Sequence, residues 1–294
     1  MIILYNMKSK LRFAKTISTI TNPPIICIPL FLIICLTLSI NNLWEFPVLE
    51  LISIIFASIL PSAIILSWAK KTNNDNDISK REDRQIPLIV GAISYFIGFL
   101  ICRFLGLNDF LTFIFLCYTI NSLIVMLITT HWKISIHTTS LSGPVCALII
   151  LLGPIGALFG LLYPVLIWSR VILKKHTISQ AIAGGVFGFV MTAVEMFLFI
   201  FIFNLNVGNI YPFAYVCGFI LAIVFTPIVL GIFTYLNFHN PLVFYLVEII
   251  GFCFFMAVTP IDVIIIYVLT TISSILISNY AGERFSWYKI IRNS

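Results

Sequence analysis

The chain has 294 residues, of which 61% are hydrophobic and only 10% are charged, and its formal net charge is +6. A soluble domain has about 25% charged residues, and a soluble chain of this size has too little interior to bury so much apolar surface. The composition therefore excludes a water-soluble globular protein. In a membrane protein, the positions of Lys and Arg indicate which loops lie in the cytoplasm, so an excess of them is no sign of nucleic-acid binding. We therefore expect contacts with membrane lipids and no nucleic-acid partner.

Long apolar runs are the main feature of the sequence. Inside a bilayer every backbone polar group must pair within the protein, which leaves helices or closed β-barrels. The runs are continuous rather than alternating, which favours an all-α, polytopic transmembrane helical bundle. Because each crossing needs about 20 apolar residues, we predict about 10 helices, with a range of about 8–10. In chain order they lie near 23–41, 46–69, 87–105, 110–130, 138–152, 154–173, 177–204, 212–235, 241–258 and 260–280.

Two details of these runs affect the helix count. The run at 23–41 follows a basic segment and has no small-residue cleavage site after it, so we expect a membrane helix rather than a signal peptide. Gly153 and Pro154 interrupt a later run of 36 residues. A single helix of that length would exceed the bilayer by about 20 Å, so we predict two helices there.

The predicted helices group into three segments. Residues 1–60 hold the basic N-terminal segment and the first transmembrane helices, 61–204 form a helical core, and 205–294 add C-terminal helices. The core contains two pairs of glycines with the four-residue spacing that lets helices approach closely: Gly156 with Gly160, and Gly184 with Gly188. We expect these glycines to mark helix–helix contacts.

The distribution of positive charge predicts the orientation of the helices. With the N-terminus inside and ten helices, 16 of the 17 Lys and Arg residues lie on the inner side, and only Arg103 lies outside. An odd number of helices would place the basic residues near the C-terminus outside. We therefore predict a multi-pass protein of the cell membrane with both termini in the cytoplasm.

Three polar stretches lie on the predicted inner face and together hold several cations, two histidines and a serine. Arginine side chains bind phosphate oxygens in pairs, one histidine can attack phosphorus, and a second can protonate the leaving oxygen. Phosphate-ester chemistry is therefore the hypothesis that best explains the combination. The candidate residues are Lys71, Arg81 and Arg84 in stretch 70–84, Ser135 and His137 in stretch 133–137, and Arg170, His176 and Gln180 in stretch 169–180.

Each stretch taken alone has a simpler explanation. Stretch 70–84 is what a solvated cytoplasmic loop looks like, Lys133 is an ordinary positive anchor at the membrane surface, and His137 at a helix start can be structural. Arg170 is harder to explain in this way, because an arginine near the end of an apolar helix costs a few kcal/mol unless it is paired or reaches the surface. The combination of Arg170 with two histidines favours a functional site.

Segment 169–176 reads Ser-Arg, five further residues and His, and this pattern resembles the third motif of the type 2 phosphatidic acid phosphatase superfamily, a group of membrane lipid-phosphate phosphatases. Segment 135–137, Ser-Ile-His, resembles the Ser-Gly-His second motif of that superfamily. Lys71 with Arg81 and Arg84 resembles its Lys…Arg first motif. The three motifs also occur in the same order as in the family. The resemblance covers most of the predicted core, which we therefore describe as phosphatase-like.

The resemblance implies an integral-membrane phosphatase that hydrolyses a lipid phosphate or diphosphate, polyprenyl or phosphatidic-acid-like, through a phosphohistidine. His176 would be the nucleophile, His137 the general acid, and Gln180 the residue that orients His176. Fixed cations would stabilise the transferring group, so neither a metal nor another cofactor is implied. The phosphoryl oxygens would be bound by Lys71, Arg81 or Arg84, Ser135 and Arg170, on the cytoplasmic face.

Three features depart from the family pattern. Ile136 stands where the second motif has Gly, which retains the backbone N–H but narrows the approach to phosphate. Lys71 and Arg81 are separated by nine residues where the first motif has six. Gln180 stands where the family has an acid, and a neutral amide can select the tautomer of His176 but stabilises a positive imidazole less well.

Two other functions are open from the sequence. The acidic residues from Asp75 to Asp83 resemble the Asp-rich loop of UbiA-type prenyltransferases, which bind a prenyl diphosphate through Mg²⁺, but a second acidic loop is missing. The other alternative is a non-catalytic lipid-phosphate binder or transporter on a phosphatase scaffold, because Glu195 and Glu248 lie within predicted helices, where ionisable groups suggest function. We expect no zinc site, since no histidine pair has ligand spacing.

Overall fold

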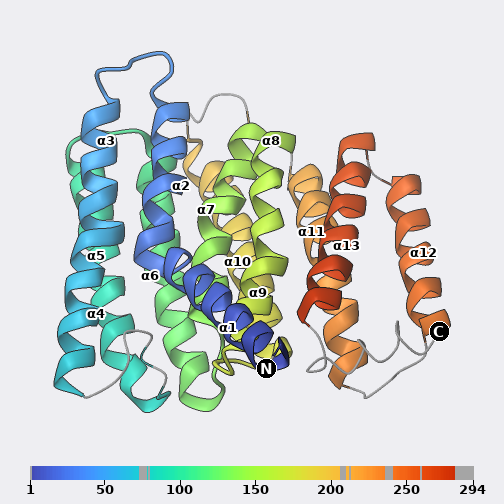
Figure 1. Cartoon of the computed structure of the whole chain (residues 1–294). Helices are drawn as coiled ribbons and strands as arrows, with labels where there is room; N and C mark the ends of the chain where they lie inside the picture. Colours follow the sequence, from blue (N-terminus) through green and yellow to red (C-terminus); the bar gives the residue numbers. More distant parts are fainter. Residues whose placement is uncertain are drawn as a thin grey trace.

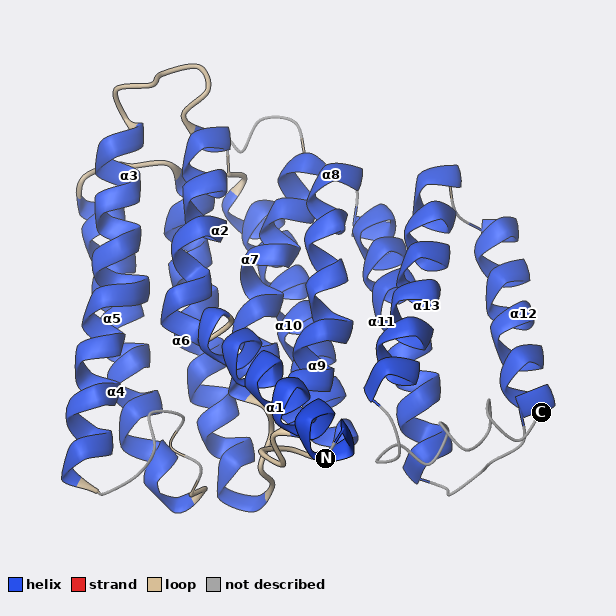
Figure 2. Cartoon of the chain, in the orientation of Figure 1, coloured by secondary structure: helices blue, strands red, loops and turns tan. Residues whose placement is uncertain are grey.

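The computed structural model shows a bundle of helices that run up and down alongside one another, with one helix lying obliquely across them (Figure 1). It describes residues 2–72, 78, 80–205, 210–211, 213–235, 241–258 and 260–281. Every regular element in these residues is a helix (Figure 2). Large apolar side chains such as Leu127, Phe201 and Ile250 are well exposed on the bundle, as lipid tolerates and water does not. The all-α prediction is therefore confirmed, and the apolar helices are those of a membrane protein.

The helices are connected mostly by short loops. Three of them, α3, η1 and α4, form one continuous helical segment in which η1 is a π-helical section, and η2 and η3 are 3₁₀ turns. In chain order the elements are α1 (Ile2–Ile20), α2 (Pro23–Leu38), α3 (Phe46–Ser53), η1 (Ile54–Ile59), α4 (Leu60–Lys71), η2 (Glu82–Arg84), α5 (Gln85–Phe104), α6 (Asp109–His131), α7 (Ile136–Leu152), α8 (Pro154–Ala157), η3 (Leu158–Leu161), α9 (Leu162–Ile172), α10 (Ile178–Phe203), α11 (Phe213–Tyr235), α12 (Pro241–Val258) and α13 (Ile261–Ala281).

Each apolar stretch predicted from the sequence is helical in the structure, including the two predicted on either side of Gly153 and Pro154. Among the described residues, five segments are long and apolar enough to cross a bilayer: Phe46–Lys71, Glu82–Phe104, Asp109–His131, Pro154–Ile172 and Ile178–Phe203. A sixth is possible if Ser9–Ile20 and Pro23–Leu38, which meet at a 57° bend, form one span. The other apolar helices, including α7, are shorter, so ten crossings with both termini in the cytoplasm stay a prediction.

The basic N-terminal segment, which the sequence analysis left without a predicted structure, forms helix α1. This helix crosses the lower end of the bundle in Figure 1 and packs against α9. Its buried side chains Ala14 and Ile17 contact Trp168 and Ile172. Because these apolar positions are separated by three residues, they lie on one face of the helix and bury only that face, which a search for continuous apolar runs does not detect.

Helix α7 lies at the centre of the bundle, where α2, α8, α10 and α11 all pack around it. Almost every residue from His137 to Ile150 is buried. A main core cluster combines residues from Ile26 to Tyr267, so the three predicted segments share one interior. The boundary predicted at residue 60 falls inside the continuous segment 46–71, whereas the boundary at 204 coincides with the end of α10.

The glycine pairs mark close helix contacts, as predicted. A Cβ atom on Gly184 would lie 2.5 Å from the Thr138 hydroxyl oxygen and 2.6 Å from the Ser135 carbonyl oxygen. One on Gly188 would lie 2.6 Å from the Cβ of Ser142. Only the absence of side chains at these positions lets α10 approach α7 so closely. Gly156 and Gly160 are equally crowded, by the Leu148 backbone and the Ile223 side chain.

We predict that Gly188→Ala lowers the free energy of unfolding by about 1–3 kcal/mol, because the added methyl group forces α10 away from α7. Gly91→Ala is the matched control, since a Cβ there would meet no atom closer than 3.7 Å. Thermal unfolding of both variants in detergent micelles checks this. Equal midpoints for the two variants would show that the α7–α10 contact does not depend on glycine.

Candidate functional site

The described parts of the three polar stretches meet at one end of the bundle, around the loop that follows α6. The loop between α6 and α7 is the common point. Its backbone carbonyl at Ile134 accepts a hydrogen bond from Arg84 at 3.3 Å, and the carbonyl of Lys133 lies 3.2 Å from Nδ1 of His176. The N–H of Ser135 donates to the carbonyl of Gln180 at 3.2 Å. Groups far apart in the sequence are therefore joined through one short loop.

The Ser-Arg-x₅-His pattern forms a compact reversal between α9 and α10. The chain leaves α9 through Lys174, whose φ of 55° lies in the left-handed region that commonly ends helices. The N–H groups of Lys175 and His176 then donate back to the carbonyl of Arg170, at 3.0 and 3.4 Å. Thr177 begins α10 as its N-cap. This turn explains the spacing, because five intervening residues return His176 to the end of the helix that carries Arg170.

Arg170 is completely buried, and its guanidinium lies between α1 and α7. Its Nη1 donates to the hydroxyl of Ser18 at 2.5 Å and lies 3.4 Å from Nε2 of His137. The neighbouring Ser169 hydroxyl donates to the Ala14 carbonyl at 2.7 Å. Helix α1 therefore supplies polar partners to the site, a contribution that the sequence analysis missed because nothing in residues 14–18 resembles a motif.

His176 is a buried histidine that faces the loop between α6 and α7. Burial lowers its pKa to about 3, and the nearby charges of Arg84, Arg170 and Lys133 add to this effect. The imidazole is therefore neutral at physiological pH. With Nδ1 facing the carbonyl of Lys133, the proton belongs on Nδ1 and the lone pair on Nε2. Among the described residues Nε2 has no hydrogen-bond partner, although it is buried.

Gln180 serves as a helix cap. Its side-chain oxygen accepts a hydrogen bond from the N–H of Thr177 at 3.1 Å, while the Thr177 hydroxyl accepts from the N–H of Gln180 at 3.2 Å. This reciprocal pair is a capping box. The group that faces Nδ1 of His176 is thus the carbonyl of Lys133, which no side-chain motif could have revealed.

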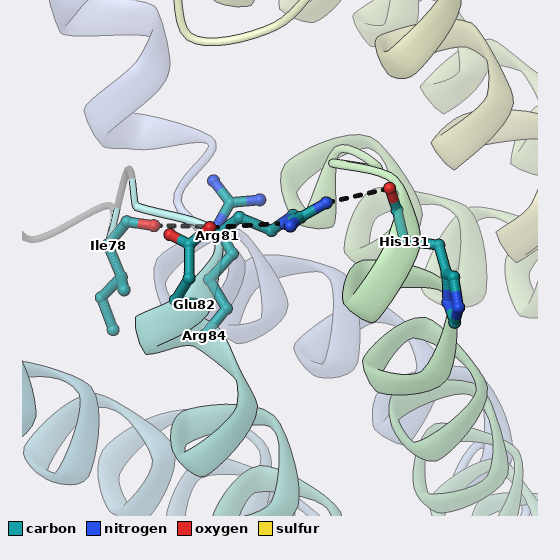
Figure 3. A network of polar contacts seen from close by, with 5 residues as sticks. All are labelled: Ile78, Arg81, Glu82, Arg84 and His131. Carbon is teal, nitrogen blue, oxygen red and sulfur yellow. Dashed lines mark hydrogen bonds and ion pairs between the residues drawn. The ribbon is translucent and has the colours of Figure 1, made fainter.

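The cations of the first stretch occupy three different environments. Arg84 is buried, and its Nε donates to the carbonyl of Ile78 at 2.8 Å. Arg81 reaches the carbonyl of His131 at 2.9 Å and pairs with Glu82 at 3.6 Å; Figure 3 shows that the His131 ring points away from this contact. Lys71 is exposed, with its ammonium 5.7 Å from the ring centre of Trp68. Of the three, only Arg84 enters the site described next.

A cavity of about 120 Å³ extends from the polar stretches into the bundle. Arg84, His137 and His176 line one end of it, and residues of α2, α4, α5, α6 and α10 line the rest. Ser135 lies next to this end at the start of α7, and its buried hydroxyl has no hydrogen-bond partner in the described part of the chain. The structure therefore brings together Arg84, Ser135, His137, Arg170 and His176. Arg84, His137 and His176 line the cavity, and Ser135 and Arg170 lie beside them without lining it. Lys71, Arg81 and Gln180 are also not among the lining residues.

The remaining candidates lie elsewhere. In the C-terminal helices, Glu248 accepts hydrogen bonds from Thr226 at 2.9 Å and Tyr267 at 2.8 Å. Glu195 lies between α6 and α10, beyond the cavity. Within the described residues no three His, Cys, Asp or Glu side chains are arranged to hold a metal ion. Asp75 of the acidic loop and His239 fall outside the described residues.

No family model, no curated protein and no solved structure matches this chain. The assignment of function therefore depends on the site itself.

We predict that acid destabilises the protein partly through His176. Its pKa is about 3 when folded and about 6.5 when unfolded, so below pH 6.5 the unfolded chain takes up a proton that the folded chain refuses. Stability is complete above that pH and falls as the pH approaches 3. Lowering the pH from 7.5 to 5 should cost the wild type about 2 kcal/mol more than His176→Asn. Thermal unfolding at the two pH values measures this, and identical losses would refute the lowered pKa.

We also predict that Gln180→Ala affects stability more than any chemistry at His176. The substitution removes half of a capping box, which costs about 0.5–2 kcal/mol. The Lys133 carbonyl still orients the imidazole, so activity at saturating substrate should fall less than about threefold. Thermal unfolding and single-turnover kinetics test the two parts. A large loss of rate with unchanged stability would assign Gln180 a direct role.

Proposed function

We propose that the protein is an integral-membrane phosphatase that hydrolyses a lipid phosphate through a phosphohistidine at His176. One observation supports this most directly: the neutral, buried and unpartnered Nε2 of His176, on a cavity that Arg84 and His137 also line. An unpaired buried nitrogen costs free energy, and folded proteins keep such groups mainly where a ligand or reaction uses them. The resemblance to type 2 phosphatidic acid phosphatases suggests the same chemistry.

Two buried arginines suit the substrate's charge. A phosphate monoester carries nearly two negative charges, and Arg84 and Arg170 place two permanent positive charges beside His176. The free hydroxyl of Ser135 can donate to a phosphoryl oxygen, which is the partner that it lacks. In a cavity from which water is largely excluded, such fixed donors stabilise the charge of the transferring group without a metal ion.

The reaction proceeds in two steps. Burial lowers the pKa of His137 well below its ordinary value, so its imidazole is neutral in the free protein and takes up the acidic proton of a bound phosphate monoanion. Nε2 of His176 then attacks phosphorus, a P–N bond forms, and the P–O bond to the lipid breaks while His137 passes that proton to the leaving oxygen. A water molecule, deprotonated by His137, attacks the phosphohistidine, the P–N bond breaks, and inorganic phosphate leaves with the proton that His137 returns to it. Arg170, which contacts His137 at 3.4 Å in the structure, turns to the phosphoryl oxygens when substrate binds. The substrate is a polyprenyl or phosphatidic-acid-like phosphate at the cytoplasmic face of the cell membrane.

The decisive test is release of phosphate from a panel of lipid phosphates by the purified protein. His176→Ala should lower the rate at least about 100-fold, because the nucleophile is lost. His131→Ala is the matched control: its exposed ring lies near the same loop but outside the cavity, and its rate should stay within about twofold of wild type. Activity should survive EDTA, which would abolish a Mg²⁺-dependent prenyl transfer. Equal rates for wild type and His176→Ala would reject the mechanism.

A further inference from the structure

The inner end of the cavity is polar, although it lies between membrane helices. Asn121 of α6 and Thr192 of α10 both line it. Nδ2 of Asn121 donates to the Thr192 hydroxyl and to Oε2 of Glu195, both at 3.2 Å. These bonds hold the amide in one orientation, with its two donor hydrogens directed to protein acceptors. The amide oxygen is what Asn121 can still offer to a ligand.

One acceptor atom at this end has no partner. Oδ1 of Asn121 is buried and has no hydrogen bond within the described residues. Asn121 is only 9% exposed. A buried carbonyl oxygen without a donor costs free energy in an apolar environment, and the asymmetry is informative: the amide nitrogen of Asn121 has partners and its oxygen has none. A group that donates a hydrogen bond would complete this end of the cavity.

The polar inner end is well separated from the phosphate end. His137 and Gly143 both line the cavity and are six residues apart on α7, which corresponds to about 9 Å along the helix. Tyr118, one turn from Asn121 on α6, lies against Gly143. The walls also include apolar residues such as Leu88 and Val125. A ligand that fills the cavity therefore meets a cation at one end, apolar walls, and an acceptor at the inner end.

We propose that Asn121, held by Thr192 and Glu195, forms a subsite for a hydroxyl group on the lipid, at the inner end of the cavity. The proposal rests on the proposed function, because it takes the phosphate at the His176 end as given. The hydrogen-bond donor on the lipid is a hydroxyl rather than an ammonium group. Among the described residues no carboxylate lines the cavity, and Arg84 makes the cavity positive, so an ammonium group would be repelled. The substrate is thus a hydroxylated lipid phosphate, which excludes an unsubstituted polyprenyl phosphate from the two substrate classes named above.

The test compares hexadecyl phosphate with analogues that each carry one hydroxyl, at successive positions along the chain. In wild type the preferred analogue should have at least about a tenfold higher kcat/KM than hexadecyl phosphate, and Asn121→Leu should remove this preference. Thr119→Val is the control, because its buried hydroxyl on the same helix bonds the Phe115 carbonyl and does not line the cavity. Thr192→Val, which releases the Asn121 amide, is a second variant if Asn121→Leu does not fold.

Affinities of hexadecyl phosphate and the preferred analogue, measured in parallel in nanodiscs, separate the two proposals. One outcome is that neither lipid is hydrolysed, but wild type binds the hydroxylated lipid about tenfold more tightly than hexadecyl phosphate and Asn121→Leu binds the two equally. In that case the phosphatase proposal fails and the subsite stands. If both are hydrolysed equally well, or Asn121→Leu slows both equally, the subsite is wrong and the phosphatase proposal stands. Equal affinities in wild type overturn the subsite whatever the rates.

Discussion

The close contact between α7 and α10 is the constraint on which the site depends. Ser135 and His137 begin α7, and His176 comes directly before α10, so the separation of these two helices sets the distance between the proposed acid and nucleophile. Gly184 and Gly188 remove the side chains that would hold the helices apart. In lipid, where the hydrophobic effect does not drive helices together, such steric fit is the main source of specificity.

Backbone carbonyls, rather than charged side chains, organise the loops around this contact. The carbonyls of His131, Lys133 and Ile134 face Arg81, His176 and Arg84, respectively. Carbonyl oxygens orient cations and imidazoles without neutralising them. The charge of Arg84 is therefore not neutralised by the Ile134 carbonyl, and it adds to the effect of burial, which keeps His176 neutral. A carboxylate in the same place would have cancelled part of that charge.

Polar groups continue from this surface into the membrane along one side of the bundle. Asn121, Thr192 and Glu195 extend it from α6 and α10, and the Ser142 hydroxyl donates to the Gly185 carbonyl at 2.8 Å between α7 and α10. Every such group costs free energy unless it is paired. Oδ1 of Asn121 is one of the buried polar atoms in the described residues that lack a hydrogen-bond partner, and it belongs to a residue that lines the cavity.

Composition and apolar runs alone determined the helical class and the positions of the long helices. The length and hydrophobicity of a segment are local properties, and they decide whether the segment can span a bilayer. The pattern of Arg170 and His176 singled out two residues that a turn brings together, although the turn itself was not predicted. Only the tertiary structure distinguished Arg84 from Arg81 and placed the Lys133 carbonyl, rather than the Gln180 side chain, at His176. It also brought α1 to Arg170. These contacts join residues far apart in the chain, often through backbone atoms that every residue has, so no local pattern encodes them.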